Sequence, residues 1–196
     1  VIGGGEFRIK VPVSFIDFVD IGKISNLNFL GRGTLGLELE NKGNGLKLMA
    51  NTKLNDFSFE DYALEKVQAS INMDIDKGTL TIPRIRGVVG DTKVAGKLSV
   101  DLEESNIEAD YKVDMLSLSS TKKILAPLIG NIKISNKEFH GTWNTVGSVS
   151  GKLDISKLDL SSTLYSSNTY IYDENLDSVS AKLNIREGKF LIEDFK

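Results

Sequence analysis

The stretch Asn72-Met73-Asp74-Ile75-Asp76-Lys77-Gly78 places three oxygen-bearing side chains at every second position before a glycine. Similar spacing occurs in loops that bind Ca²⁺ through carboxylate and amide oxygens. A calcium loop needs glycine directly after its third ligand, where this chain has Lys77, and no glutamate follows at the required distance. Alternation of Met73 and Ile75 with the carboxylates is also typical of the solvent side of a strand. We therefore predict no metal site here.

Other residues that could do chemistry stand alone. His140 is the single histidine, lies in the sequence Glu-Phe-His-Gly-Thr-Trp and has no second histidine or cysteine to complete a catalytic or metal-binding set. The pair Glu103-Glu104 follows a predicted strand end and is interpreted as a solvated turn, and Trp143 as a packing residue. No nucleophile elbow, phosphate-binding loop or dinucleotide-binding glycine motif is present. The sequence predicts no catalytic residue, no cofactor and no enzymatic activity.

Composition narrows the class of protein. The chain has 196 residues, 40% of them hydrophobic, a formal net charge of -3 and no cysteine. These values are typical of a globular domain and exclude a disulfide scaffold. Basic residues are spread singly along the sequence, so we predict no nucleic-acid partner. No run of about 20 apolar residues is present. Since the first residue is Val1, we expect a segment excised from a longer chain, with residues 1–5 as a linker or cut end.

Alternation of apolar and polar residues with period two runs through most of the chain and predicts strands. Gly31, Gly33 and the cluster Asn41-Lys42-Gly43-Asn44-Gly45 supply the turn residues of tight antiparallel hairpins. The predicted fold class is all-β, with one long antiparallel sheet. Residues 119–130 predict a short helix, because hydroxyl residues precede an apolar edge that ends at Pro127 and Gly130. Residues 14–23 are a weaker helix candidate.

Two segments resemble each other. The stretch from Leu64, LEKVQASINMDIDKGTLTI, is similar to LDSVSAKLNIREGKFLIEDF from Leu176, with Arg186 in the position of Asp76. VAGKLSVDL from Val94 is similar to VSGKLDISKL from Val149. Approximate repeats over 64–118 and 145–196 predict one continuous domain over residues 6–196, in which neighbouring units complete each other's core.

An alternating sheet must bury its apolar side against helices, a second sheet, itself or a ligand. The helix candidates are too few to do this. Closure of the two halves would give a sandwich or barrel, whereas an open sheet would leave a trough lined by Leu, Ile and Val. An acyl chain in such a trough gains roughly 0.8 kcal/mol for each methylene removed from water.

These long alternating strands, the units DIDKGTLTI and NIREGKFLI, and the interruption LAPLIGNIKI resemble the TamB and AsmA-like envelope proteins. The resemblance implies a long, curved sheet folded into a taco-like groove with an apolar interior. It also implies the periplasmic part of a protein anchored in the inner membrane, which shields phospholipid acyl chains on their way to the outer membrane and contributes to outer-membrane biogenesis. Implied partners are phospholipid, flanking repeats of the same chain and an outer-membrane assembly protein.

The same resemblance implies which residues line the groove, namely the apolar members of the alternating runs. They are Leu35, Leu37, Leu39, Leu46, Leu48, Val67, Ala69, Ile71, Met73, Leu80, Ile82, Val94, Leu98, Val100, Leu102, Ile107, Ala109, Tyr111, Val113, Leu153, Ile155, Leu158, Leu160, Val179, Ala181, Leu183, Ile185, Phe190 and Ile192. The alternative hypothesis is a structural or adhesive β-solenoid segment of a surface protein, with a closed core and no lipid cargo. Such solenoids have a regular period near 20 to 25 residues, whereas the spacing here is irregular.

Overall fold

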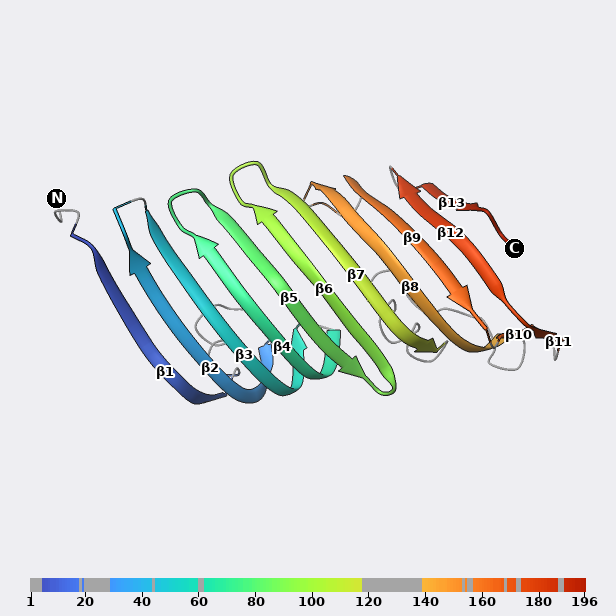
Figure 1. The fold of residues 1–196 in the computed structure, drawn as a ribbon, viewed down its shortest axis with the longest axis horizontal. Helices are drawn as coiled ribbons and strands as arrows, with labels where there is room; N and C mark the ends of the chain where they lie inside the picture. The colour runs from blue at the N-terminus through green and yellow to red at the C-terminus, as the bar shows by residue number, and fades with distance from the viewer. Residues whose placement is uncertain are drawn as a thin grey trace.

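The computed structural model describes residues 5–17, 19, 29–43, 45–59, 62–117, 139–152, 154, 157–167, 169–171, 174–186 and 189–196. Over these residues the chain forms thirteen β-strands (Figure 1). They are β1 (Phe7–Asp17), β2 (Phe29–Asn41), β3 (Leu46–Phe59), β4 (Tyr62–Asp74), β5 (Thr79–Val89), β6 (Thr92–Asp101), β7 (Asn106–Ser117), β8 (Phe139–Lys152), β9 (Leu158–Ser166), β10 (Thr169–Ile171), β11 (Glu174–Leu176), β12 (Val179–Arg186) and β13 (Lys189–Glu193).

The strands form one open antiparallel sheet in almost strict sequence order. Each strand from β1 to β8 pairs with the next strand along the chain, β9 pairs with β12, and β12 pairs with β13. β10 pairs with the first residues of β8 and with β11, so these two short strands extend one end of the sheet. The all-β fold class and the sequential hairpins predicted from the sequence are therefore confirmed.

The described residues test the two helix candidates only in part. Residues 119–130 lie outside the described residues. Of the candidate at 14–23, residues 14–17 belong to strand β1, because their pairing with β2 continues the ladder to Asp17 and Arg32. Val19 is assigned to a helix, and its N–H donates to Asp17 Oδ1 at 3.1 Å. The remaining residues of that candidate lie outside the described residues. In the described ranges, no helix has the length and apolar character needed to cross a membrane.

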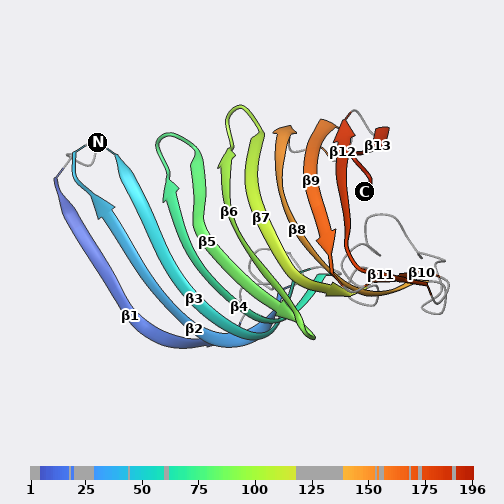
Figure 2. The same cartoon turned by 45° about the vertical axis from the view of Figure 1, so that its right-hand side comes forward.

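Turns and bulges follow from residues with special backbone chemistry. Gly78 and Gly90 both have φ of 58° and close the β4–β5 and β5–β6 hairpins, a conformation that glycine adopts without a Cβ penalty. The register shifts between Val11 and Ser14 in β1, and between Ile82 and Ile85 in β5. Each shift contains a proline, which donates no ladder hydrogen bond and favours a bulge. Figure 2 shows that the strands bend along their length.

Backbone hydrogen bonds join successive hairpins at one rim of the sheet. Ile75 N donates to Leu46 O at 2.9 Å, and Leu102 N donates to Gly78 O at 2.8 Å. The rim contacts therefore connect the β2–β3, β4–β5 and β6–β7 hairpins to one another. At the other end of the chain, Ser180 and Lys196 exchange two backbone hydrogen bonds of 3.0 Å, which continues the pairing of β12 beyond β13.

Candidate functional site

Strand pairing assembles one continuous apolar face, and the candidate site is built from it. Residues that are direct partners in a ladder project from the same side of a sheet. One row of direct partners runs through nine strands: Ile9, Leu39, Leu48, Met73, Leu80, Val100, Ile107, Gly151 and Leu158. A second row continues through Ile82, Leu98, Ala109, Val149, Leu160 and Ile185. We call the side that carries these rows the apolar face, and the opposite side the polar face.

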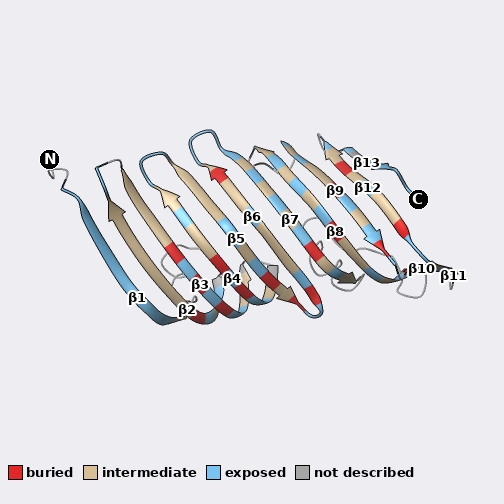
Figure 3. Ribbon diagram, in the orientation of Figure 1, coloured by how far each residue is buried: buried red, intermediate tan, exposed pale blue. Residues whose placement is uncertain are grey.

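Burial differs along the apolar face. Its most buried members include Ala50, Leu54, Val67, Ala69 and Val100. Figure 3 shows such buried positions recurring in the middle strands, whereas β1 is exposed along most of its length. Phe7, Ile9 and Val11 of β1 and Ile192 of β13 are large apolar side chains that stay exposed. Most other apolar-face residues of the middle strands, such as Leu48, Ile71 and Leu98, are half-buried.

Most of the predicted lining residues lie on this apolar face. Met73 of β4 pairs with Leu80 of β5. In β12, Val179, Ala181 and Leu183 lie on the same side as Ile185, which belongs to the apolar face. Leu102 instead lies in the β6–β7 turn and is 45% exposed, because the ladder ends at Asp101. Leu153 and Ile155 lie outside the described residues. For Phe190 the structure gives the backbone pairing with Ile185 and no side-chain placement.

Sequence reasoning missed hydroxyl side chains that are buried on the same face. Thr52 and Thr92 donate to the carbonyls of Thr34 and Met115 at 3.1 and 3.0 Å. The hydroxyls of Thr145 and Ser162 are 2.6 Å apart and both residues are buried. The sequence does carry a signal for their side of the sheet, because each stands at an apolar position of an alternating run. Thr52, for example, stands between Ala50 and Leu54 at even spacing. Each hydroxyl is satisfied, which removes most of the cost of its burial.

Ion pairs occupy the polar face. The Arg8 guanidinium lies 2.6 Å from the Glu38 carboxylate, and this hydrogen bond lowers the pKa of Glu38 and raises the pKa of Arg8. Lys97 approaches Asp110 at 2.8 Å, and that hydrogen bond raises the pKa of the lysine. A hollow of about 380 Å³ lies beside this pair, and its lining includes Ser99, Glu108 and Ser150. Pro83, Leu98, Ala109 and Val149 also line the hollow, so hydroxyl, charged and apolar groups share its wall.

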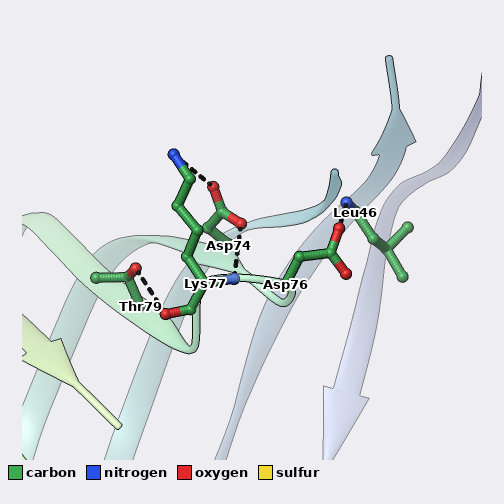
Figure 4. A network of polar contacts seen from close by, with 5 residues as sticks. All are labelled: Leu46, Asp74, Asp76, Lys77 and Thr79. Atoms are coloured by element: carbon green, nitrogen blue, oxygen red, sulfur yellow. Dashed lines mark hydrogen bonds and ion pairs between the residues drawn. The ribbon is translucent and has the colours of Figure 1, made fainter. Parts of the chain in front are cut away.

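The candidate calcium loop has a structural role in the hairpins. Figure 4 shows Asp76 directed toward the backbone of Leu46, whose N–H donates to Asp76 Oδ2 at 2.8 Å. Asp74 accepts from Lys77 N at 3.3 Å, across its own turn. The two carboxylates therefore serve different backbone groups and do not converge on one point. Among the described residues, no group of three or more His, Asp or Glu side chains could hold a metal ion.

The other candidate residues have separate surroundings. His140 is exposed and stacks on Tyr170, with ring centroids 4.6 Å apart and planes 6° from parallel. Glu103 and Glu104 lie in the exposed turn between β6 and β7. Trp143 is half-buried and pairs with Leu116 across β7 and β8.

Comparison of the chain with protein-family models, with curated proteins and with solved structures finds no match.

Proposed function

We propose that this chain is a lipid-conducting segment that shields phospholipid acyl chains along its apolar face. The observation that carries the proposal is the row from Ile9 to Leu158, in which nine consecutive strands place apolar residues or glycine on one side. A hydrocarbon chain needs no specific polar contact, so a long apolar surface is sufficient for binding. About a dozen buried methylenes would contribute roughly 10 kcal/mol before ordering costs.

Bending of the sheet supports a groove on the apolar side. In a single-layer sheet, side chains on the concave side shield one another, whereas those on the convex side face solvent. Ala50, Leu54, Val67 and Val113 are all buried and all lie on the apolar face. This asymmetry favours a curved, taco-like sheet with the apolar face inside, which would hold acyl chains and leave head groups in water.

The biological setting follows from the resemblance to TamB and AsmA-like proteins. In that setting the chain is a periplasmic part of an inner-membrane-anchored envelope protein, and it carries phospholipid toward the outer membrane. Flanking repeats would extend the apolar face at the sheet edges, and an outer-membrane assembly protein would be a partner. The alternative is a structural or adhesive segment, whose apolar face would be closed by protein and carry no lipid.

Native mass spectrometry of the purified protein tests lipid binding directly. We expect co-purified phospholipid, or uptake of phospholipid from added vesicles. Protein that is lipid-free and also rejects added lipid would contradict the proposal and favour the structural alternative.

A matched pair of variants tests the role of the apolar face. Ile71 and Asn72 are adjacent in β4 and project from opposite faces. Ile71→Asp places a charge on the apolar face and is expected to reduce both bound phospholipid and transfer of labelled phospholipid between vesicles. Asn72→Asp adds the same charge to the exposed polar face and should leave both unchanged. Leu98→Asp repeats the test on β6. Circular dichroism establishes that each variant is folded, and equal transfer by folded Ile71→Asp would refute the assignment.

A further inference from the structure

Strand pairing also gathers five basic residues on the polar face, although they are distant in sequence. Lys53 of β3 aligns with Gln68 of β4, which aligns with Arg86 of β5. In the adjoining row, Lys66 aligns with Val88, which aligns with Lys93 of β6. Arg84 lies on the same side, opposite Ser70. We call Lys53, Lys66, Arg84, Arg86 and Lys93 the basic patch.

The basic patch gathers five cations that have no ion-pair partner among the described residues. All five side chains are exposed, and none forms an ion pair with another residue in the described part of the chain. Nine other cations do have acidic partners, at Arg8, Arg32, Lys42, Lys77, Lys97, Lys112, Lys152, Lys157 and Lys182. Lys10, Lys47, Arg186 and Lys189 form no ion pair with a described residue either, but they belong to other parts of the sheet. The patch is therefore an accessible cationic surface on a chain whose formal net charge is -3.

Dimensions and neighbours define what the patch can bind. Four adjacent strands spaced about 4.8 Å apart make it roughly 14 Å wide. The two rows contain no acidic residue between β3 and β6. Asp114 of β7 borders the patch as the direct ladder partner of Lys93, and its carboxylate is paired with Lys112 at 2.9 Å. Glu65 of β4 accepts a hydrogen bond from Gly90 N at 2.9 Å. Like charges that lie together without partners repel one another, and an opposing anionic surface would relieve that repulsion.

The chemistry of the patch favours one class of anionic partner. A protein interface normally has buried aromatic or large apolar anchors, whereas Val88 and Ala95 are the only apolar side chains in these two rows. A single-stranded nucleic acid needs aromatic stacking platforms, and these rows contain no aromatic residue. A lipid bilayer with anionic head groups needs neither feature, since attraction to clustered Lys and Arg is sufficient. We propose that the basic patch holds the protein against the surface of an anionic bilayer.

Co-sedimentation with vesicles tests this binding. The wild-type protein should bind vesicles of phosphatidylcholine mixed with phosphatidylglycerol, and bind vesicles of phosphatidylcholine alone much more weakly. High salt should weaken the anionic binding because it screens exposed charges. The triple variant Lys53→Gln, Arg84→Gln, Arg86→Gln should lose at least about tenfold in affinity, given the contribution of each basic residue near a bilayer.

A charge-matched control removes the same three charges elsewhere. Lys42→Gln, Lys77→Gln, Lys157→Gln neutralises lysines that already have acidic partners, and its affinity for anionic vesicles should stay within about threefold of wild type. Equal losses in the two triple variants, or no preference for anionic vesicles, would overturn the proposal. Tighter binding to duplex DNA than to anionic vesicles would overturn it in favour of a nucleic-acid surface. Native mass spectrometry of the patch variant measures its uptake of phospholipid independently of its binding to vesicle surfaces. The test of the basic patch is therefore separate from the test of the proposed function.

Discussion

The ring of Tyr111 in β7 lies over Gly147 in β8, and a Cβ atom added to Gly147 would stand 2.5 Å from the Tyr111 hydroxyl oxygen. The two residues are direct partners in the ladder. Glycine at this position lets the aromatic ring lie along the sheet, as in other cross-strand pairs of glycine with an aromatic residue.

Gly147→Ala is therefore expected to lower the free energy of unfolding by about 1 to 3 kcal/mol, the usual cost of overpacking. The added methyl group would also meet the Ser161 carbonyl oxygen, which is backbone and cannot rotate away. Urea unfolding measures the effect. Gly87→Ala is the matched control, because a Cβ there meets its nearest atoms at 3.5 Å, in ordinary contact. Similar losses in both variants would contradict this account of Gly147.

Asp76→Ala should loosen the contact between the β2–β3 and β4–β5 hairpins. The variant removes the acceptor of the 2.8 Å hydrogen bond from Leu46 N, a loss of about 1 kcal/mol for an exposed bond. Hydrogen exchange of the Leu46 amide should accelerate, while exchange in β9 and β12 stays unchanged. Asp76→Asn keeps an oxygen acceptor and should restore part of the protection. An unchanged Leu46 exchange rate would argue against the bond.

Added calcium should leave the melting temperature unchanged. Asp76 Oδ2 is already engaged by Leu46 N, and Asp74 by Lys77 N, so a metal ion would have to displace both bonds. A thermal scan with and without Ca²⁺ checks this, and a rise of several degrees would mean that the carboxylates form a metal loop after all.

The Arg8–Glu38 pair predicts a component of stability that disappears in acid. The hydrogen bond from Arg8 lowers the pKa of Glu38 from its ordinary value of 4.5. A carboxyl whose folded-state pKa is lowered contributes stability above its unfolded pKa and loses it as pH falls through the folded value. The stability difference between wild type and Glu38→Gln should therefore shrink as pH drops below that ordinary value. Arg8→Gln should remove the same component, and a difference that stays constant with pH would contradict the pairing.

A double-mutant cycle tests the buried hydroxyl pair of Thr145 and Ser162, whose oxygens lie 2.6 Å apart. Thr145→Val leaves the Ser162 hydroxyl without this partner and should cost about 1 to 3 kcal/mol. Ser162→Ala should cost a similar amount. The double variant should be less destabilised than the sum, because no orphaned polar group remains. Strict additivity would show that the hydroxyls do not interact.

Period-two alternation is a local property, so the sequence could predict the strands and the side from which each residue projects. Leu48, Ala50 and Leu54 share a face in the structure because their spacing is even, whatever strand pairs with them. Leu102 shows the limit of this reasoning. It lies at the same even spacing as Leu98 and Val100, but the turn between β6 and β7 begins directly after Asp101, where the pairing of these two strands ends.

Alignment between strands could not be predicted in the same way. Register depends on where bulges fall, and the shift near Pro83 changes which residues of β5 oppose β4 and β6. The basic patch arises only from this alignment, since Lys53, Arg86 and Lys93 look like isolated charges along the sequence. Sequence reasoning accordingly predicted the strands and their alternation, and it missed the basic patch.

The sequential pairing order has a consequence for how the molecule unfolds. Each described strand contacts almost only its hydrogen-bonded neighbours, so cohesion is close to a sum of nearest-neighbour terms, as in repeat proteins. Loss of an outer strand such as β1 removes one interface and leaves the others intact. We expect unfolding to begin at the edge strands and to proceed strand by strand toward the centre. Protection of backbone amides against hydrogen exchange should then rise from β1 toward the central strands.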